Sequence, residues 1–149
     1  MTRVEVTGGC QCGRIRYVAL IADDEAYLCH CRMCQRATGG VAAAFKNLPR
    51  NAVTWLTEPD YFASSSIARR GFCATCGAPL SFEYVEGATQ IDLTIGSFDE
   101  PGRFRPTSHF GIESRYDAWL DMTGLPGKRS DEHKPLVNRW MNKLGKLPD

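Results

Sequence analysis

Long apolar runs are absent from this sequence of 149 residues. No stretch approaches the roughly 18 consecutive apolar residues that a membrane-spanning helix needs, so we expect no membrane partner. The opening segment, MTRVEVTGGCQC, also lacks the apolar centre of a secretory signal peptide. We therefore expect a soluble protein of the cytoplasm.

A strong excess of either charge is absent as well. The chain has 18 Lys and Arg against 17 Asp and Glu, which gives a formal net charge of +1. A nucleic-acid-binding domain usually presents a strongly basic face, whereas the basic doublets Arg69-Arg70 and Lys128-Arg129 stand isolated here. We interpret both doublets as solvated surface and expect no nucleic-acid partner. An apolar fraction of 43% is sufficient for the core of one domain.

The sequence also lacks an even set of cysteines. It has seven, an odd number that suits a disulfide framework poorly in a chain without a secretory signal. Isolated cysteines are most often buried and inert. These seven fall instead into three tight clusters, which indicates metal binding. The clusters are Cys10 with Cys12, Cys29 with Cys31 and Cys34, and Cys73 with Cys76.

Two of the clusters together have the composition of a structural zinc site. In GGCQCG, Cys10 and Cys12 share one face of an extended chain and lie roughly 6.6 Å apart along it. The flanking glycines let the backbone bend and bring the sulfur atoms closer. In CATCG, Cys73 and Cys76 form the tight turn of a zinc knuckle. The two pairs supply the four thiolates of a closed structural site.

The stretch CHCRMC then forms a set of three thiolates, Cys29, Cys31 and Cys34. A zinc ion with three protein ligands keeps its fourth position for water or substrate, as catalytic zinc sites do. The spacing leaves another partition open, in which Cys31 and Cys34 join Cys73 and Cys76, and the remaining three cysteines form the open set. Redox cycling by CRMC is disfavoured, because the surrounding sequence is not a βαβ pattern and Cys29 would be superfluous.

The rest of the chain indicates mostly short strands. Residues 13–21 alternate in polarity and place Ile15, Tyr17, Ala19 and Ile21 on one face. Pro, Gly and Asn separate further segments with the composition of strands. We predict strands over residues 3–6, 13–21, 41–48, 53–56, 79–85 and 89–98, extended edges over 103–111 and 115–122, and a short helical turn after Cys34.

The C-terminal segment has a different period. Apolar residues recur at helical spacing and are followed by Gly145 as a stop signal. They are Leu136, Val137, Trp140, Met141 and Leu144. We therefore expect residues 127–149 to form a linker and a short amphipathic helix, packed on the domain that residues 1–126 form.

The cysteine blocks resemble a known family. GGCQCGRIRY, CHCRMCQRATGG and GFCATCGAPLSF are similar to the three cysteine blocks of the glutathione-dependent formaldehyde-activating enzyme family, which shares its domain with the centromere protein V group. The later IGSFDEP, the pair His109-Phe110, and Trp119 with residues 124–126 also resemble the family pattern. The similarity covers roughly residues 8 to 126, with all seven cysteine positions filled.

The resemblance implies a mainly β fold of the Mss4-like kind, in which zinc ions staple small antiparallel sheets. It implies two zinc ions per chain: a structural ion on Cys10, Cys12, Cys73 and Cys76, and a catalytic ion on Cys29, Cys31 and Cys34. It also implies a carbon–sulfur lyase that joins glutathione and formaldehyde into S-hydroxymethylglutathione. The expected partners are therefore a small thiol such as glutathione and a small aldehyde.

Histidines are the usual groups for proton transfer near neutral pH. His109 lies in a family-like segment and is the candidate catalytic histidine. His30 sits between two cysteine ligands, and on an extended chain its side chain points away from them, so we expect it to orient the loop. His133 is expected to be exposed in the C-terminal helix.

An anionic thiol such as glutathione needs a positive side chain near the open zinc. The candidates are Arg32, Arg36, Arg69 and Arg70, although their spacing singles out none and we interpret each as a solvated surface charge. A second class of function stays open, a zinc-stabilised binding module in which both metals are structural. Changing Cys34 to Ser separates the two, because an enzyme keeps its fold and loses turnover, whereas a structural site loses stability.

Overall fold

A computed structural model describes residues 2–148 and confirms the mainly β fold. The chain forms two compact units, one that extends to Tyr116 and one that begins at Asp117. The first unit contains two β-sheets and the helix α1 (Arg32–Thr38), and the second contains the helix α2 (Lys134–Leu144). Neither helix is long and apolar enough to span a bilayer.

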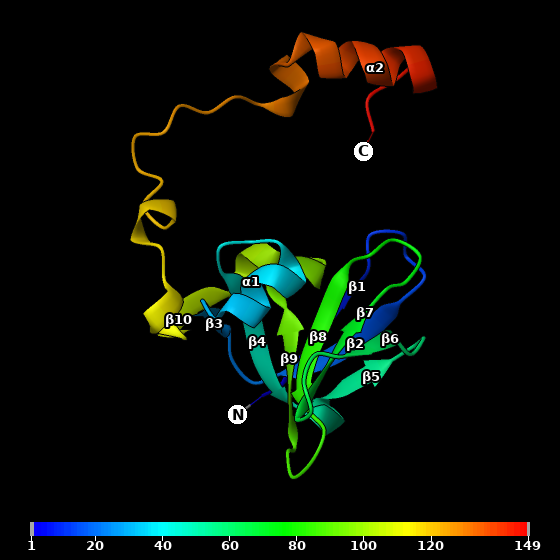
Figure 1. Cartoon of the computed structure of the whole chain (residues 1–149). Helices are drawn as coiled ribbons and strands as arrows, with labels where there is room; N and C mark the ends of the chain where they lie inside the picture. The colour runs from blue at the N-terminus through cyan, green and yellow to red at the C-terminus, as the bar shows by residue number, and fades with distance from the viewer. Residues whose placement is uncertain (1, 149) are drawn as a thin grey trace. The chain divides into compact units, whose positions relative to one another are not determined.

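The larger sheet has seven strands and forms most of the first unit (Figure 1). Its order is β10 (Arg105–Phe110), β3 (Glu25–Cys29), β4 (Ala43–Pro49), β9 (Gln90–Thr94), β8 (Pro79–Tyr84), β7 (Ala68–Phe72) and β6 (Asp60–Ala63). All neighbours pair antiparallel except β10, which lies parallel to β3. The predicted extended edge over residues 103–111 is thus a real edge strand, whereas β3, β6 and β7 had no predicted counterpart.

The smaller sheet has three antiparallel strands in the order β1 (Val4–Gly9), β2 (Arg16–Ile21) and β5 (Val53–Trp55). The predicted apolar face of residues 13–21 is confirmed, because Ile15, Tyr17, Ala19 and Ile21 are all fully buried. Tyr17, Ala19 and Ile21 pack in one core cluster with Ile91 and Leu93 of the larger sheet. This shared core joins the two sheets, since burial of apolar side chains is the dominant favourable term in folding.

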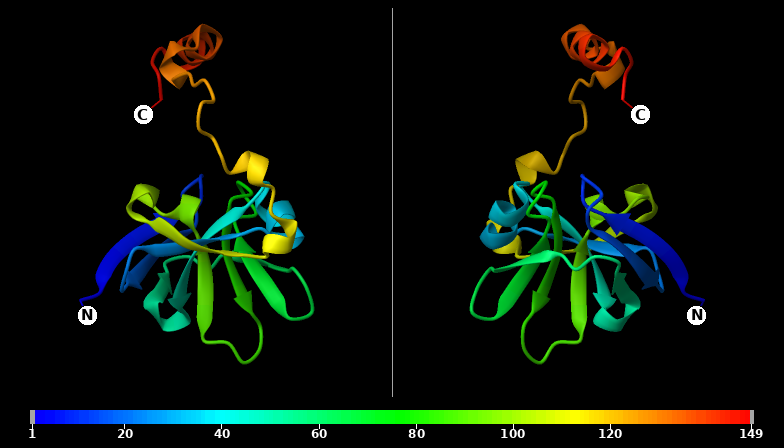
Figure 2. Two further views of the ribbon diagram at one scale, coloured as in Figure 1. Left: turned by 90° about the vertical axis from the view of Figure 1, so that its left-hand side faces the viewer. Right: turned by 90° about the vertical axis from the view of Figure 1, so that its right-hand side faces the viewer.

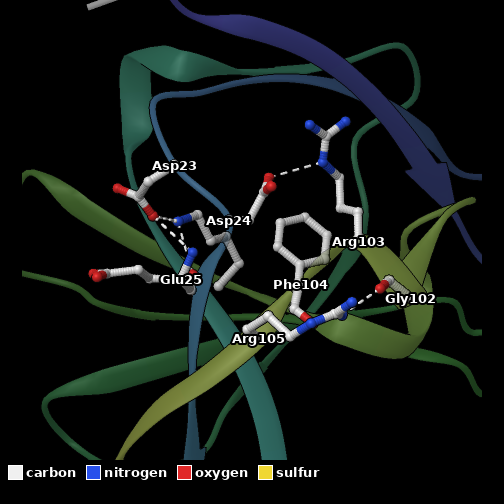
Figure 3. Close-up of polar contacts among 8 residues, drawn as sticks. Asp23, Asp24, Glu25, Gly102, Arg103, Phe104 and Arg105 are labelled. Atoms are coloured by element: carbon white, nitrogen blue, oxygen red, sulfur yellow. Dashed lines mark hydrogen bonds and ion pairs between the residues drawn. The ribbon is translucent and has the colours of Figure 1, made fainter.

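Polar contacts fasten the start of β10 to the start of β3 (Figure 3). The Nε of Arg103 donates to Oδ1 of Asp24 at 2.8 Å, and the backbone N–H of Arg105 donates to the Asp24 carbonyl at 2.9 Å. On β4, the buried Lys46 donates to Asp23 at 2.5 Å and to the Glu25 carbonyl at 2.8 Å. These contacts fix the parallel pairing that places the later residues of β10 beside the end of β3.

The helix α1 connects β3 to β4 at one end of the larger sheet (Figure 1). Its N-cap is Cys31, whose sulfur accepts from the N–H of Cys34, and its C-cap is Gly39 in the left-handed region at φ 78°. Glycine suits that C-cap because it carries no Cβ to clash. The β8–β9 hairpin lies at the opposite end (Figure 2). The predicted helical turn after Cys34 is confirmed as the last turn of α1.

The second unit contains the predicted C-terminal helix. α2 ends where Gly145 takes φ 72° and donates its N–H to the Met141 carbonyl, as the sequence predicts. His133 precedes the helix as its N-cap and is exposed. Residues 117–119 form a 3-10 turn, so the extended edge predicted over 115–122 is wrong there. The packing of α2 on the domain stays a prediction.

Candidate metal centres and the cavity beside one of them

The first cysteine cluster joins two loops. Cys10 and Cys12 lie between β1 and β2, and Cys73 and Cys76 lie between β7 and β8, in loops that meet at the same end of the first unit (Figures 1 and 2). All four sulfur atoms lie within 4.8 Å of one another. The Cys10–Cys12 and Cys12–Cys73 sulfur distances are 3.6 and 3.7 Å. These match the edge of about 3.8 Å in a tetrahedron with zinc–sulfur bonds of about 2.3 Å, so the donor set fits a four-coordinate metal.

The two loops of this cluster share a backbone pattern. In each, the first cysteine donates its N–H to the carbonyl five residues on, Ile15 or Ala78, at 3.0 Å. A glycine in the left-handed region then closes the turn, with φ of 82° at Gly13 and 79° at Gly77. The N–H of Ile15 also donates to the sulfur of Cys10 at 3.2 Å. Backbone donors directed at sulfur favour thiolates, so the loops are prepared for a cation.

An ion pair beside the loops acts on one of the thiols. Arg14 pairs with Asp60, whose carboxylate also accepts the N–H of Ala74 at 2.7 Å. Burial raises the pKa of Cys73. Hydrogen bonds from the N–H of Cys76 and the side chain of Arg14 act in the opposite direction, and the pKa falls to about 6. A thiol that ionises below neutral pH binds a metal more readily, because the thiolate is the ligand.

The second cluster contains the other three cysteines. Cys29 ends β3, Cys31 caps α1 and Cys34 lies in its first turn, and their sulfur atoms lie within 4.8 Å of one another. Cys29 and Cys34 are buried and Cys31 is half-buried. The structure therefore forms the first partition that the spacing allowed, and the alternative that placed Cys31 and Cys34 with Cys73 and Cys76 is not formed.

A buried glutamine and a histidine pair surround this loop. The Nε2 of Gln35 lies within 3.1 Å of the carbonyl oxygens of His30, Val41 and Ser114, which joins three segments. His30 is fully buried, and its Nε2 lies 2.8 Å from Nδ1 of His109 on β10. Sequence analysis did not find the role of Gln35, since a glutamine after the third cysteine gives no signal of its own.

A cavity of about 480 Å³ opens beside the three cysteines. Its floor is one face of the larger sheet, because side chains on alternate positions of paired strands share a face. A row of these side chains crosses five strands at paired positions. Tyr27 lies opposite Phe45, Asn47 opposite Asp92, Asp92 opposite Phe82, and Phe82 opposite Arg70. His109 also lines the cavity. The predicted catalytic histidine thus lies at the same cavity as the three-cysteine cluster.

The position of Arg70 corrects the interpretation of the basic doublet as surface. Arg70 is only 8% exposed, its Nη2 lies 3.3 Å from the sulfur of Cys34, and its guanidinium lies over the Phe82 ring. It has no carboxylate partner among residues 2–148. Hydrogen bonding from Cys29 and from Arg70 lowers the pKa of Cys34 to about 5, although burial opposes this shift. Arg70 is therefore the positive charge of the three-cysteine site.

The other candidate arginines lie elsewhere. Arg69 alternates to the opposite face of β7, where it pairs with Glu83 at 2.5 Å and lies over the Tyr61 ring. Arg32 donates to the side chain of Gln35 at 2.5 Å, and Arg36 is exposed. Of the four candidates, only Arg70 lines the cavity.

A larger cavity of about 690 Å³ lies on the side of Cys10 and does not reach the three-cysteine cluster. Its charged lining residues, Arg16 and Asp99, bind each other at 2.9 and 2.5 Å. These charges neutralise each other, whereas the smaller cavity contains thiols, a guanidinium that donates to one of them, and a carboxyl. The smaller cavity is the better candidate for chemistry.

A mainly β domain held by one four-cysteine and one three-cysteine cluster, each able to hold a metal ion, defines the class of Mss4-like metal-binding proteins. Residues 5–114 match the family described as glutathione-dependent formaldehyde-activating enzyme, and the chain belongs to that family.

The chain is also similar to one curated protein and to one solved structure. An uncharacterized lyase of Schizosaccharomyces pombe is 34% identical over 83 residues, which cover 56% of this chain and 61% of the relative, so the match spans less than two thirds of the relative's length. A crystal structure of a Rhodobacter sphaeroides protein superposes with a TM-score of 0.56 at 17% identity, covering 69% of this chain and 98% of that one. The latter supports the fold alone.

Proposed function

We propose that this protein is a zinc-dependent carbon–sulfur lyase that acts on a small thiol–aldehyde adduct, of the S-hydroxymethylglutathione synthase type. Family membership and the lyase name of the yeast relative support the reaction class. The observation that carries the proposal is the three-cysteine cluster at the wall of a 480 Å³ cavity. A three-thiolate site that opens to a cavity has room for a substrate ligand.

The two metal sites are proposed to have different roles. Zinc on the four-cysteine cluster would have no free position and would hold the loops together. Zinc on Cys29, Cys31 and Cys34 would supply one chemical function, which is to hold the substrate sulfur as a thiolate. We favour this function over polarisation of the aldehyde, because three thiolate ligands weaken a zinc ion as a Lewis acid.

The chain's own residues would bind and orient the adduct. Arg70 offsets the negative charge that three thiolates create, since opposite charges this close in a dry site attract strongly. Phe45 and Phe82 give the cavity apolar walls and limit the entry of water. In the cleavage direction the carbon–sulfur bond breaks, its electron pair goes to sulfur, and the hydroxyl oxygen loses its proton as the aldehyde carbonyl forms. Synthesis is the reverse.

The first experiment measures zinc per chain in reduced protein by native mass spectrometry, before and after addition of glutathione. We expect two zinc ions and a retained glutathione adduct in the wild type. Formaldehyde release from S-hydroxymethylglutathione should also exceed the uncatalysed rate. Two zinc ions with neither an adduct nor faster release would overturn the proposal in favour of a binding module with two structural metals.

A further inference from the structure

The wall of the cavity contains one carboxyl group. Among the described residues, Asp92 is the only Asp or Glu that lines it. The neighbours of Asp92 on β9, Ile91 and Leu93, are buried in the core between the sheets, so alternation along the strand directs Asp92 to the opposite face. That face also carries the arginine that donates to Cys34.

Two neighbouring side chains act on the Asp92 carboxyl. The Nδ2 of Asn47, its antiparallel partner on β4, donates to Oδ1 of Asp92 at 3.0 Å. The hydroxyl of Tyr27 on β3 acts on the same carboxyl and lowers its pKa. The hydrogen bond from Asn47 orients the carboxyl, which forms no ion pair within residues 2–148 and therefore stays available to exchange a proton.

The surroundings also place its titration closer to neutral pH. Burial raises the pKa of Asp92, and the negative charge of Cys34 on α1 acts in the same direction, while hydrogen bonds from Asn47 and Tyr27 oppose them. The other titratable or charged groups that line the cavity are Arg70 on β7, His109 on β10, Tyr84 on β8, and Cys29 and Cys31. A general acid or base works best when it titrates near the working pH.

We propose that Asp92 is the proton-transfer residue of the reaction, an inference that rests on the proposed function. In cleavage, the Asp92 carboxylate takes the proton of the adduct hydroxyl while the oxygen forms the carbonyl and the carbon–sulfur electron pair leaves with sulfur. In synthesis, the protonated Asp92 returns that proton to the carbonyl oxygen as the thiolate attacks carbon. The substrate class is therefore a hemithioacetal with a free hydroxyl.

The predicted histidine is less suited to this step. The Nδ1 of His109 is already engaged by His30 at 2.8 Å, and His109 lies on the edge strand β10, where it is exposed. Asp92 lies instead on the central strand of the sheet, between β4 and β8. Its strand is therefore hydrogen-bonded to a neighbour on each side, whereas β10 has a neighbour on one side only.

Asp92→Asn tests the proposal, since the amide keeps the size of the side chain and an oxygen that can accept from Asn47. The assay measures initial formaldehyde release from S-hydroxymethylglutathione into excess semicarbazide, with the uncatalysed rate subtracted. We expect a loss of about 10²–10⁴-fold, with two zinc ions and the glutathione adduct retained. Asp131→Asn, which removes only an exposed ion pair with Arg129, is the matched control and should keep the wild-type rate.

The pH profile gives a second readout. The rate of wild-type cleavage should decrease as pH falls through the pKa of Asp92, because the protonated carboxyl cannot accept a proton. Asp92→Asn should lack this decrease in rate at low pH. Zinc content measured at each pH shows whether a lower rate comes from protonation of Asp92 or from loss of zinc. If Asp92→Asn does not fold, Asp92→Glu replaces it, and the pH at which the cleavage rate decreases should then differ from that of the wild type.

Three results would overturn the inference. In the first, the wild type is active, and Asp92→Asn keeps a rate within threefold of it and the same decrease in rate at low pH. This result rules out the role of Asp92 but leaves the proposed function intact. An Asp92→Glu profile identical to that of the wild type does the same. A wild type that does not accelerate release removes the proposed function and this step with it.

Discussion

The two cysteine clusters of this protein are built in opposite ways. The four-cysteine cluster joins two similar loops from distant parts of the sequence and supplies four sulfurs that lie within 4.8 Å of one another. The three-cysteine cluster comes from a single strand–helix junction, Cys29 to Cys34, and has a cavity at its open side. One arrangement closes a metal site and links the fold, and the other leaves a position next to solvent-accessible space.

The groups that surround the two cysteine clusters also differ. Around Cys10 and Cys73 backbone N–H groups in tight turns favour ionised thiols, and the side chain of Arg14 adds to their effect at Cys73. Around Cys34 the positive charge comes from the side chain of Arg70, and the cavity beyond it contains Asp92. Backbone donors suit a permanent site, whereas side chains that face a cavity suit a site that exchanges ligands.

The largest effect is expected from Cys73→Ser, which removes one ligand of the closed set. Cys73 is fully buried and anchors a loop to the core, so loss of its metal should unfold this end of the domain. Structural zinc contributes about 10–16 kcal/mol in small zinc domains, more than most domains have in total stability. Circular dichroism and zinc content should show an unfolded or aggregated protein at 37 °C. A folded variant with one zinc would contradict the structural role.

Cys34→Ser should instead separate folding from activity. It removes one ligand of the open set but leaves the four-cysteine cluster and the shared core intact. We expect one zinc per chain, a melting temperature much closer to that of the wild type than to that of Cys73→Ser, and a loss of formaldehyde release of at least about 100-fold. If Cys34→Ser destabilises the protein as much as Cys73→Ser, the second site is structural and the comparison between the clusters fails.

The sequence predicts the three groups of cysteines well because spacing within each group is local, whereas spacing left open how the groups combine into two sites. CHCRMC and the two cysteine pairs each fold within a few residues, and the face of Tyr17 and Ile21 follows from simple alternation. The C-terminal helix is also local, since period and Gly145 define it. Features of this kind depend on neighbours in the chain and need no knowledge of the tertiary structure.

The cavity could not be predicted in the same way, because it depends on register between distant strands. Asp92 meets Asn47 and Phe82 only once β9 lies between β4 and β8. The strand β7 contains two arginines and a glycine, a composition that suggests surface, yet alternation buries Arg70 and leaves Arg69 half-buried on the opposite face. Knowing that β7 is a strand would have shown that the two arginines face opposite sides, although not which side has the cysteines.

A smaller effect is expected from Arg70→Met at the three-cysteine cluster. Because Arg70 lowers the pKa of Cys34, its removal should raise that pKa and let protons compete with the metal at higher pH. Partners outside the ligand set typically contribute 10–100-fold in metal affinity. We expect one of the two zinc ions to be released at higher pH than in the wild type, as followed with a chromogenic chelator. Arg69→Met, on the other face of β7, is the control and should leave the release profile unchanged.

The smallest effect concerns the ion pair of Arg16 with Asp99, which lines the larger cavity beside Cys10. Asp99 accepts from Arg16 and Thr7, and these bonds lower its pKa to about 2. A carboxyl with a depressed folded-state pKa stabilises the protein above its ordinary value near 3.8 and loses that contribution as pH falls through about 2. Because the pair is 43% exposed at Asp99, solvent limits its contribution to at most about 1 kcal/mol. Asp99→Asn should therefore lower stability slightly at pH 7, as urea unfolding would show, and the difference from the wild type should shrink steadily below pH 4. A difference that stays constant with pH would mean that Asp99 acts through packing and not through its charge.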